Sequence, residues 1–542
     1  MRDTLAAKAA RHGLLYAVLA FGLAACGGGG GGGGSGGDDD GGGGDGGGGG
    51  GGGGGTSELP TSTSSSQTAY ITSTATGWQV VPLVTVGDTP PGSSYAMAGK
   101  PDGLGAFAGR VSETGEVVDT GDYFTVLMNH ELRDEQGVAR AHGTKGAYVS
   151  QWTFELDTLR VHSARDLATH VYTYTDGAWA DSTGAVTFDR LCSADLAPTS
   201  AYFNSATGRG YEGRIFTNGE EVDDSGRAFA WIVGGAEHGR AYHLPHLGRL
   251  TFENVVANPA SGDATIVVGL DDIREGQVYV YVGRKSSEGN PVERAGLHGG
   301  KLYGVRVTSG GANYGSGAVP LEDAGAIEGA FELVDVSDVA TGLGSELQSA
   351  SVARGITQFA RPEDGAWDGA DARVFYWVTT GASVNGSMQT ARLYRLTFDS
   401  LDNPTGGTIE LVVDSAELRG TDGLTADGFD NITVAGDGHV IVQEDGGSGD
   451  GYLSKIWRID PSTGTATQIF ESDRSRFLAG GASFLTSDEE NSGVIEVTDV
   501  VRNASWYDSG RRYYLGTSQA HYPHETASLV EGGQLYLFAS PD

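Results

Sequence analysis

Residues 188–222 contain the side chains with the clearest chemical potential. Cys192 is the only cysteine left once an N-terminal targeting segment ending at Cys26 is set aside, and the adjacent carboxylates Glu220 and Glu221 follow it. A single thiol in an exported protein has no disulfide partner, so it is a buried inert residue, a reactive group or a metal ligand. Adjacent carboxylates at the end of an apolar strand are costly unless a cation pairs with them. The alternative interpretation is structural: a small buried thiol and a solvated turn.

Further carboxylate and amide side chains lie where predicted strands begin or end. Oxygen ligands of this kind suit a hard cation such as calcium, and an added thiolate widens the choice to iron or another transition metal. Each short motif alone also fits an ordinary turn, because Asp and Asn are common turn residues. Their repeated placement at strand ends is the stronger signal. The motifs are Met128-Asn-His-Glu131, Phe252-Glu-Asn254, Leu270-Asp-Asp272, Arg361-Pro-Glu-Asp364, Asp427-Gly-Phe-Asp-Asn431, Gln443-Glu-Asp445 and Asp488-Glu-Glu490.

The elements that must position these residues are short β-strands. Alternating runs rich in Val, Ile, Tyr and Trp, such as 123–128, 277–282 and 373–378, are bounded by Gly, Asp and Asn. Helical periodicity is weak and confined to 321–330. Runs 301–307, 392–398 and 455–460 share a basic residue followed by an aliphatic–aromatic pair, at unequal spacings. We therefore predict an all-β body that forms a six-bladed β-propeller, with an array of β-sandwiches as the alternative.

The N-terminal region is expected to export and tether this body. Residues 1–26 combine basic residues, an apolar run and Leu23-Ala-Ala-Cys26, which is typical of a bacterial lipoprotein signal with Cys26 as the acylated residue. The apolar run is too short to span a membrane comfortably, although an uncleaved anchor remains the alternative. Residues 27–69 form a Gly-rich and then Ser/Thr-rich linker, and residues 70–542 form one large domain. We expect a lipid anchor as the only membrane contact.

The net charge of −35 is spread along the chain. It excludes nucleic acid and anionic membrane surfaces as expected partners. An anionic substrate would also be repelled unless bound metal reversed the local field. No Gly-x-x-x-x-Gly-Lys loop and no Gly-x-Ser-x-Gly elbow around Cys192-Ser193 occurs, so the sequence favours neither a nucleotide hydrolase of that type nor a serine hydrolase.

In order and type, these motifs resemble the PhoX-type alkaline phosphatases, a bacterial calcium-dependent family. The resemblance runs from about Pro101 to Asp460 and rests on Pro101-Asp-Gly103, Met128-Asn-His-Glu131, Cys192 with Glu220-Glu221, Glu253-Asn254, Asp271-Asp272, Arg361-Pro-Glu363, Asp427 to Asn431, and Glu444-Asp445. It implies a six-bladed propeller whose central site holds iron and calcium and hydrolyses phosphate monoesters. Members of the family are often exported through a twin-arginine signal, but Ala10-Arg11-His12 offers no twin arginine.

The resemblance also implies roles for individual residues. Cys192 resembles an iron-binding thiolate, and Arg361 resembles a cation that contacts phosphate beside a catalytic Glu363. Ca2+ and Fe3+ are the implied cofactors, and the implied partner is a small phosphorylated substrate of a monomer at the cell envelope. The other implied metal ligands are Glu220, Glu253, Asp271, Glu363, Asn129, Glu131, Asp430 and Glu444.

Two other functions remain open. The first is a calcium-dependent lactonase or phosphotriesterase-like hydrolase, which would need calcium but not Cys192. The second is a surface module without catalysis, in which calcium only stabilises the propeller.

Overall fold

The computed structural model describes residues 58–61, 63–309, 322, 325–384, 387–447 and 451–541. The chain divides into the units Met1–Gly55 and Thr56–Asp542, and the fold below concerns the second unit. The predicted signal segment, Cys26 and residues 27–57 of the predicted linker lie outside the described residues, so they stay predictions. Within the described part, no helix is long and apolar enough to cross a membrane.

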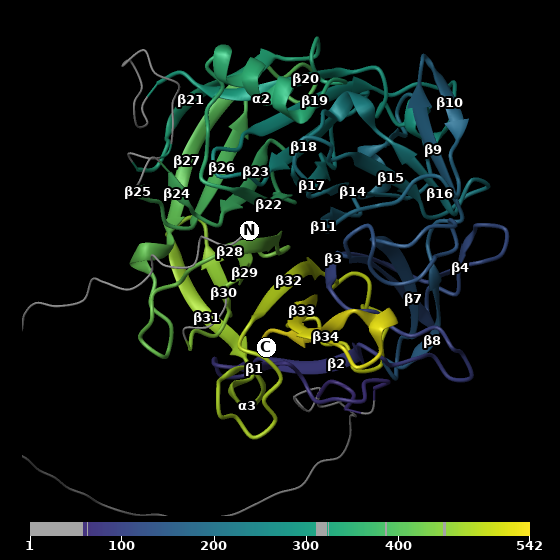
Figure 1. Cartoon of the computed structure of the whole chain (residues 1–542), viewed down its shortest axis with the longest axis vertical. Helices are drawn as coiled ribbons and strands as arrows, with labels where there is room; N and C mark the ends of the chain where they lie inside the picture. The colour runs from purple at the N-terminus through teal and green to yellow at the C-terminus, as the bar shows by residue number, and fades with distance from the viewer. Residues whose placement is uncertain are drawn as a thin grey trace, which may run out of the picture. The chain divides into compact units, whose positions relative to one another are not determined.

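Six β-sheet blades surround a central axis in the described part of the chain (Figure 1). Each blade places one strand at the axis, and the next blade follows it around the ring. Neighbouring inner strands contact one another, and the last inner strand contacts the first, so the ring closes. The predicted all-β, six-bladed propeller is confirmed. The inner strands are β3 (Pro101–Ala108), β11 (Leu191–Asp195), β17 (Phe252–Ala257), β22 (Pro362–Trp367), β28 (Phe429–Val434) and β32 (Glu489–Glu496).

Blades 1 to 3 follow the chain outward from the axis by antiparallel pairing. Blade 2 is widened by a hairpin that comes before its inner strand in the sequence. Blade 1 is β3, β6 (Tyr123–His130), β7 (Tyr148–Glu155) and β8 (Val161–Asp166). Blade 2 is β11, β14 (Ile215–Glu220), β15 (Ala228–Ile232) and β16 (Arg240–His243), with β9 (His170–Thr175) and β10 (Ala178–Asp181). Blade 3 is β17, β18 (Ala264–Asp271), β19 (Val278–Arg284) and β20 (Lys301–Val307).

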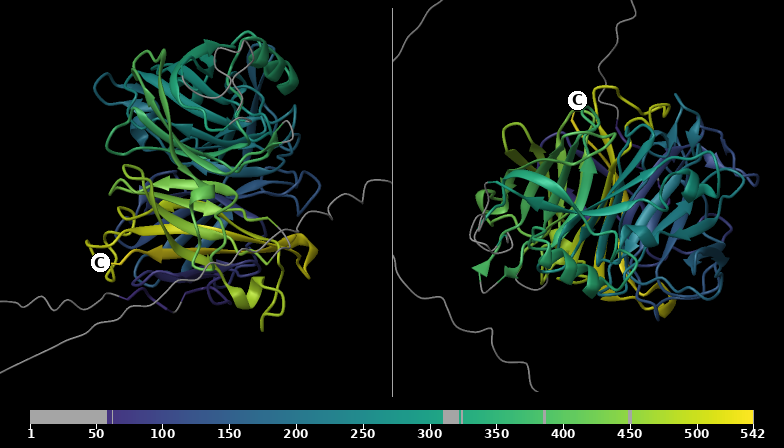
Figure 2. Two further views of the ribbon diagram at one scale, coloured as in Figure 1. Left: turned by 90° about the vertical axis from the view of Figure 1, so that its left-hand side faces the viewer. Right: turned by 90° about the horizontal axis from the view of Figure 1, so that it is seen from above.

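Blades 3 and 4 form one nine-stranded sheet, because β21 (Gly329–Asp335) pairs with an outer strand of each. Strands from the start of the domain complete blades 5 and 6, so the propeller closes by pairing its two ends (Figure 2). Blade 4 is β22, β23 (Val374–Thr379), β26 (Arg392–Phe398) and β27 (Gly406–Asp414). Blade 5 is β28, β29 (Val440–Glu444), β30 (Lys455–Asp460) and β31 (Thr465–Ser472), with β1 (Ile71–Ser73). Blade 6 is β32, β33 (Tyr513–Pro523) and β34 (Glu531–Ala539), with β2 (Gln79–Thr85).

The remaining described elements are short. The three runs that looked alike in the sequence are β20, β26 and β30, which are the fourth, third and third strands of their blades, so they do not mark one equivalent position. The longest described helix lies at 344–353. Of the run 321–330, residues 321, 323 and 324 lie outside the described residues, and residues 329 and 330 belong to β21. The short elements are β4 (Arg110–Val111), β5 (Val117–Val118), β12 (Phe203–Asn204), β13 (Arg209–Gly210), β24 (Ser383–Val384), β25 (Ser387–Met388), α1 (Pro291–Arg294), α2 (Gly344–Ala353), α3 (Arg474–Phe477), η1 (Thr199–Ala201), η2 (Pro245–Leu247), η4 (Ser415–Glu417) and η5 (Ala527–Leu529).

The hydrophobic core lies between adjacent blades. Alternating apolar side chains of one blade pack on those of the next, as where Leu127 of blade 1 joins Phe216 and Trp231 of blade 2. A fully buried aliphatic or aromatic side chain contributes about 1.5–3 kcal/mol through burial, so these seams hold the ring together. This packing fixes the inner strands around the axis.

Every inner strand carries an irregularity in its pairing near its start. The register with the second strand shifts between the first residue and the fourth in five blades, and between the third and the sixth in blade 6. A β-bulge of this kind re-aims side chains and is common beside active sites. The shifts fall between Pro101/Leu104, Leu191/Ala194, Phe252/Val255, Pro362/Gly365, Phe429/Ile432 and Asn491/Val494.

Candidate metal centre

The second residue of every inner strand is a carboxylate or the thiol. These six residues form what we call the inner ring, and each stands directly beside the bulge of its strand. Four are buried and the two from blades 5 and 6 are half-buried. The members are Asp102, Cys192, Glu253, Glu363, Asp430 and Glu490.

A second set of polar residues comes from the neighbouring strand of each blade. The first residue of each inner strand pairs with a residue of the second strand, and the residue after that partner belongs to this set. We call the set the outer ring. Four members are carboxylates, whereas blade 4 supplies a hydroxyl and blade 6 an imidazole. The members are Glu131, Glu221, Asp272, Thr380, Asp445 and His521.

The two rings bring donor atoms together in three linked groups. Asp102, Glu131 and Cys192 have donor atoms within 4.8 Å of one another, as do Cys192, Glu221 and Glu253. Glu253 also joins Glu363 and Asp430 in a third group with the same spacing. Because Cys192 and Glu253 each belong to two groups, a continuous chain of ligand atoms runs from blade 1 to blade 5.

Burial and mutual repulsion disfavour the charged forms of these groups. Burial is the largest cause that raises the pKa of the Cys192 thiol, and the carboxylate of Asp102 adds to it. Two buried oxygens, Asp102 Oδ1 and Glu253 Oε1, have no hydrogen-bond partner among the described residues. A cation would partner both oxygens and relieve the repulsion, so the donor set fits metal ions. Desolvation, supported by neighbouring carboxylates, also raises the carboxyl pKa values of Asp102, Glu253, Glu363 and Asp430.

Three cationic side chains come from one repeated position, two residues before an inner-ring member. Lys100, Arg190 and Arg361 all have left-handed backbones, with φ of 51°, 45° and 64°. A non-glycine residue rarely adopts this conformation, which costs about 1–3 kcal/mol and clusters at functional sites. Blade 5 has Gly428, with φ of 60°, at the equivalent place. The turn that starts these blades therefore presents a cation beside the rings.

Both arginines are held by outer-ring carboxylates. Arg190 Nε lies 2.7 Å from Glu131 and its Nη2 lies 2.6 Å from Glu221. Arg361 donates two hydrogen bonds of 2.7 Å to Asp272 and lies 3.0 Å from Glu363. The charge of Glu363 is the largest cause that raises the pKa of Arg361, so this guanidinium stays charged. Its side chain is 37% exposed, which leaves room for an anion to approach.

Residues 236–502 match the family model described as alkaline phosphatase PhoX. This match, over 267 of the 542 residues, supports the PhoX-type family for this chain. The matched region includes Glu253, Arg361, Glu363 and Asp430 of the centre, whereas Cys192 precedes it. No curated protein matches the sequence.

Two solved structures with some similarity to this PhoX-type chain differ in how closely they match. Pseudomonas fluorescens PhoX, in complex with the transition-state analogue vanadate, is 14% identical, with a TM-score of 0.53 over 90% of this chain and 98% of that one. A subtype N10 neuraminidase-like protein of A/little yellow-shouldered bat/Guatemala is 10% identical, with a TM-score of 0.33 over 87% of this chain and 100% of that one. The PhoX likeness at this identity shows a shared propeller fold.

The structure brings together six of the predicted site residues of this PhoX-type chain. They lie in the rings or in the turn beside them. Five are members of the three donor groups, and one is the guanidinium that pairs with Asp272. The residues are Cys192, Glu131, Glu253, Glu363, Asp430 and Arg361.

Three predicted ligands point away from the rings. Glu220 forms two hydrogen bonds of 2.6 Å with Arg227, and Asp271 accepts one from the Thr251 amide. Glu444 accepts a hydrogen bond of 2.7 Å from the Trp457 indole. Each is the first residue of an acidic doublet. Because successive strand residues face opposite sides, the second residue of each doublet reaches the centre instead.

Asn129 is close to the centre but engaged with the backbone. Its amide nitrogen donates to the carbonyl oxygen of Cys192 at 2.6 Å, and its oxygen accepts from Asn218 at 2.8 Å. It therefore positions the strand that carries the thiol rather than offering a free ligand atom.

Several members of the centre were missed as site residues. Glu221, Asp272 and Asp445 belong to the recognised doublets, but alternation could assign them only once the buried face of each strand was known. Asp102 and Glu490 had a usable signal, since each is an acidic residue in the second position of an inner strand. The cations Lys100 and Arg190 had none, because a left-handed backbone cannot be seen in one sequence.

His521 introduces a positive charge into the outer ring. Its Nδ1 lies 2.8 Å from Glu531 and its Nε2 lies 3.4 Å from Glu490. Against the desolvation that would lower it, these two carboxylates raise the imidazole pKa to about 11. Burial is the largest single influence on Glu490 and would raise its pKa, but the hydrogen bond and charge of His521, together with Ser492 and Lys100, lower the pKa to about 2. Blade 6 thus contributes a neutral pair where the other blades contribute net negative charge.

Proposed function

We propose that this chain is a metal-dependent phosphoesterase that hydrolyses small phosphate monoesters. The observation that carries the proposal is the series of three linked groups of donor atoms. Beside them lie the cationic side chains of Lys100, Arg190 and Arg361, whose backbones are left-handed. The family match supports phosphatase chemistry, and Pseudomonas fluorescens PhoX is known with vanadate, a transition-state analogue. Metal ions at such a centre supply positive charge that polarises a phosphoryl group.

The donor chemistry favours two kinds of ion. Glu253, Glu363 and Asp430 offer oxygen alone, which suits Ca2+. Cys192 adds sulfur to the carboxylates of Asp102 and Glu131, which suits Fe3+ or another transition metal. Glu221 would complete the ligands between these two regions. We infer that the loaded centre contains both ions.

The protein's own residues bind and orient the substrate. A guanidinium can donate to two phosphate oxygens at once and cannot lose its charge, so Arg361 and Arg190 are suited to hold the phosphoryl group. Glu363, 3.0 Å from Arg361, keeps that guanidinium at the centre. Thr380 donates a short hydrogen bond to Glu363 and fixes the carboxylate in turn. Positioning and charge stabilisation are most of what phosphoryl transfer requires.

We further propose that the enzyme acts at the cell envelope as a monomer, anchored by lipid on Cys26. Residues 27–69 would separate the propeller, residues 70–542, from the membrane. The net charge of −35 supports a partner range limited to small molecules, without nucleic acid.

Elemental analysis and an aryl-phosphate assay on the same purified full chain test the proposal. We expect bound calcium and iron, and turnover that disappears on chelation. Cys192→Ser should remove the iron and lower kcat/KM at least about 100-fold, since even partners of metal ligands contribute about 10–100-fold. Asp338→Asn is the control, because it removes an exposed carboxylate paired with Arg354.

Other outcomes separate the alternatives. Calcium-dependent hydrolysis of lactones or phosphotriesters that tolerates Cys192→Ser would indicate a different propeller hydrolase. Calcium binding that raises the Tm, with no ester hydrolysed in any metal condition, would indicate a surface module without catalysis.

A further inference from the structure

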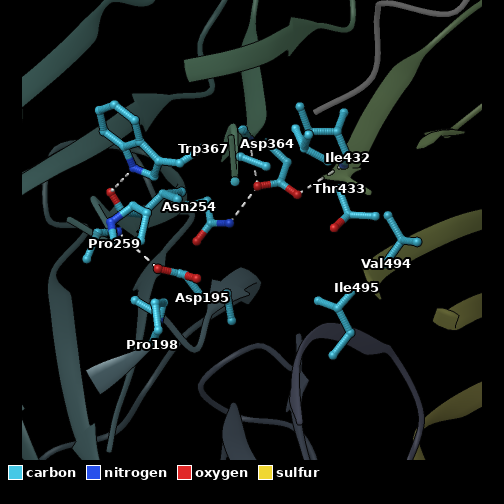
Figure 3. Close-up of a pocket in the computed structure, with 18 residues that line it drawn as sticks. Asp195, Pro198, Asn254, Pro259, Asp364, Trp367, Ile432, Thr433, Val494 and Ile495 are labelled. Carbon is cyan, nitrogen blue, oxygen red and sulfur yellow. Dashed lines mark hydrogen bonds between the residues drawn. The ribbon is translucent and has the colours of Figure 1, made fainter. Parts of the chain in front are cut away.

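A cavity lies on the propeller axis, beyond the inner ring. Its volume is about 300 Å³, and its walls come from five of the six inner strands (Figure 3). The lining residues follow the ring members along those strands: Asp195 on β11, Val256 on β17, Trp367 on β22, Val434 on β28 and Ile495 on β32. The cavity therefore occupies the opposite end of the inner strands from the metal centre. We call it the axial cavity.

A layer of hydrogen-bonded side chains separates the axial cavity from the inner ring. The layer contains Ser193, Asn254, Asp364 and Asn431, each of which directly follows a ring member. Asn254 donates to Asp364 at 2.5 Å between neighbouring blades. Asn431 of blade 5 donates a short hydrogen bond to Ser193 of blade 2, and this bond crosses the axis. The two sites are therefore chemically distinct compartments.

Asp195 is the acidic residue that faces the axial cavity with a carboxylate oxygen that accepts no hydrogen bond from the described residues. Its Oδ2 accepts a hydrogen bond of 3.0 Å from the Ala257 amide, while its Oδ1 accepts none from the described residues. Asp364 is also in the wall, but both of its oxygens accept hydrogen bonds. The lining contains no Lys or Arg. Burial raises the pKa of Asp195 to about 7, which reflects the lack of a cationic partner.

The rest of the lining decides which cation would fit. Pro198, Trp367, Ile432, Val434 and Ile495 line the cavity with apolar side chains, and Figure 3 labels all of them but Val434. A bare calcium ion needs six to eight oxygen ligands, and this wall does not offer them. An anion would meet a carboxylate with no compensating charge. A volume near 300 Å³ with a few polar groups among apolar side chains is typical of a small-molecule site.

We propose that the axial cavity binds a small organic cation, an ammonium group carried on a compact apolar body. The ammonium donates to Oδ1 of Asp195, and the hydroxyl of Thr433, which also lines the cavity, is a second polar partner. The apolar body packs against Trp367 and the branched side chains of β28 and β32. This site is independent of the phosphoryl chemistry proposed above.

Calorimetry on the full chain with three probes of one shape tests this proposal. Benzylammonium, benzyl alcohol and benzoate differ mainly in charge, and saturating calcium keeps the ring carboxylates occupied. We expect benzylammonium to bind at least about 10-fold more tightly than the alcohol, because a hydrogen bond to a charged group contributes more than a neutral one. Benzoate should not bind.

Two variants locate the binding. Asp195→Asn keeps an oxygen for the Ala257 amide and should weaken benzylammonium at least about 10-fold. Ala366→Phe should fill the cavity and abolish binding of both benzylammonium and the alcohol. Equal affinity for the ammonium and the alcohol, or affinity unchanged in Asp195→Asn, would overturn the proposal. Loss of binding in Asp272→Asn instead would assign the cation to the outer ring and also overturn it.

Discussion

Adjacent carboxylates in this propeller perform different tasks. Glu220 ends β14 and Glu221 directly follows it. Glu220 is 1% exposed and paired with Arg227, whereas Glu221 faces Cys192 and Glu253. The same division separates Asp271 from Asp272. The first residue of each doublet stabilises the blade and the second reaches the centre. One residue of offset along a strand thus decides between a structural and a functional carboxylate.

Glu221→Gln and Glu220→Gln form a matched pair that tests this division. We expect Glu221→Gln to reduce the metal content and the phosphatase activity while the fold persists, because it replaces a negatively charged carboxylate ligand with a neutral amide. Glu220→Gln should retain metal but lose about 1–3 kcal/mol of unfolding free energy, since Arg227 is left without its charged partner. Metal content, kcat/KM and chemical denaturation measure the three effects.

The reverse outcome would contradict the assignment. Metal loss in Glu220→Gln with an intact centre in Glu221→Gln would mean that the two side chains exchange faces when metal binds.

At the scale of the element, the start of the inner strand has the same local structure in each blade. A turn, an acidic or thiol residue and a bulge recur in the same order in all six described blades, and three of the turns place a cation in a left-handed backbone. Close strand approach is part of this local structure. A Cβ added to Gly103 would lie 2.3 Å from the Ala194 amide nitrogen, so β3 and β11 meet there backbone to backbone.

We predict that Gly103→Ala forces these two inner strands apart. It should lower the unfolding free energy by about 1–3 kcal/mol, the typical cost of overpacking. Phosphatase activity should fall as well, because Asp102 and Cys192 would separate. Gly121→Ala is the control, since a Cβ at Gly121 meets nothing within 4 Å, and its Tm should be unchanged or slightly higher. A Tm for Gly103→Ala equal to that of the control would show that β3 and β11 can accommodate the added methyl group.

The sequence predicted part of this arrangement of inner strands and site residues. Strand alternation predicted the propeller, and acidic residues at strand ends together with Cys192 predicted a metal site. Glu253, Glu363 and Asp430 were named as ligands only through the resemblance to the PhoX-type family. The sequence did not show which residue of each of the three doublets faces the centre, because both residues of a doublet are acidic. Lys100 and Arg190 depend on a backbone conformation that only the folded turn reveals.

For the whole molecule, buried negative charge should make stability depend on pH and metal together. Burial, reinforced by Glu490, raises the pKa of Asp445 from 3.8 to about 7. The unfolded carboxyl loses its proton near pH 4, but the folded one keeps it until about pH 7. The folded state therefore binds more protons in this window, and its stability falls as pH rises. His521, whose raised pKa is about 11, adds a loss of stability above about pH 6.5.

We expect the Tm of the chelated protein to fall steadily between pH 5 and pH 8. Saturating calcium should reverse this trend, because ionised carboxylates bind the ion more tightly at higher pH. Scanning calorimetry at several pH values, with chelator and with calcium, measures both slopes. A chelated protein whose Tm rises across the same window would show that the ring carboxyls do not carry raised pKa values.

The pairing of β2 with β34 joins the start of the propeller domain to its last strand. Asp102 follows β2 near the start of the domain, and Glu490 begins the last blade, so the two ends of the polypeptide must meet before both rings are whole. A chain that is cut short or still being made leaves β2 without its partner and the ligand set open at blade 6. We therefore predict that metal binding requires the complete chain, and that a chain ending before blade 6 assembles only part of the two rings.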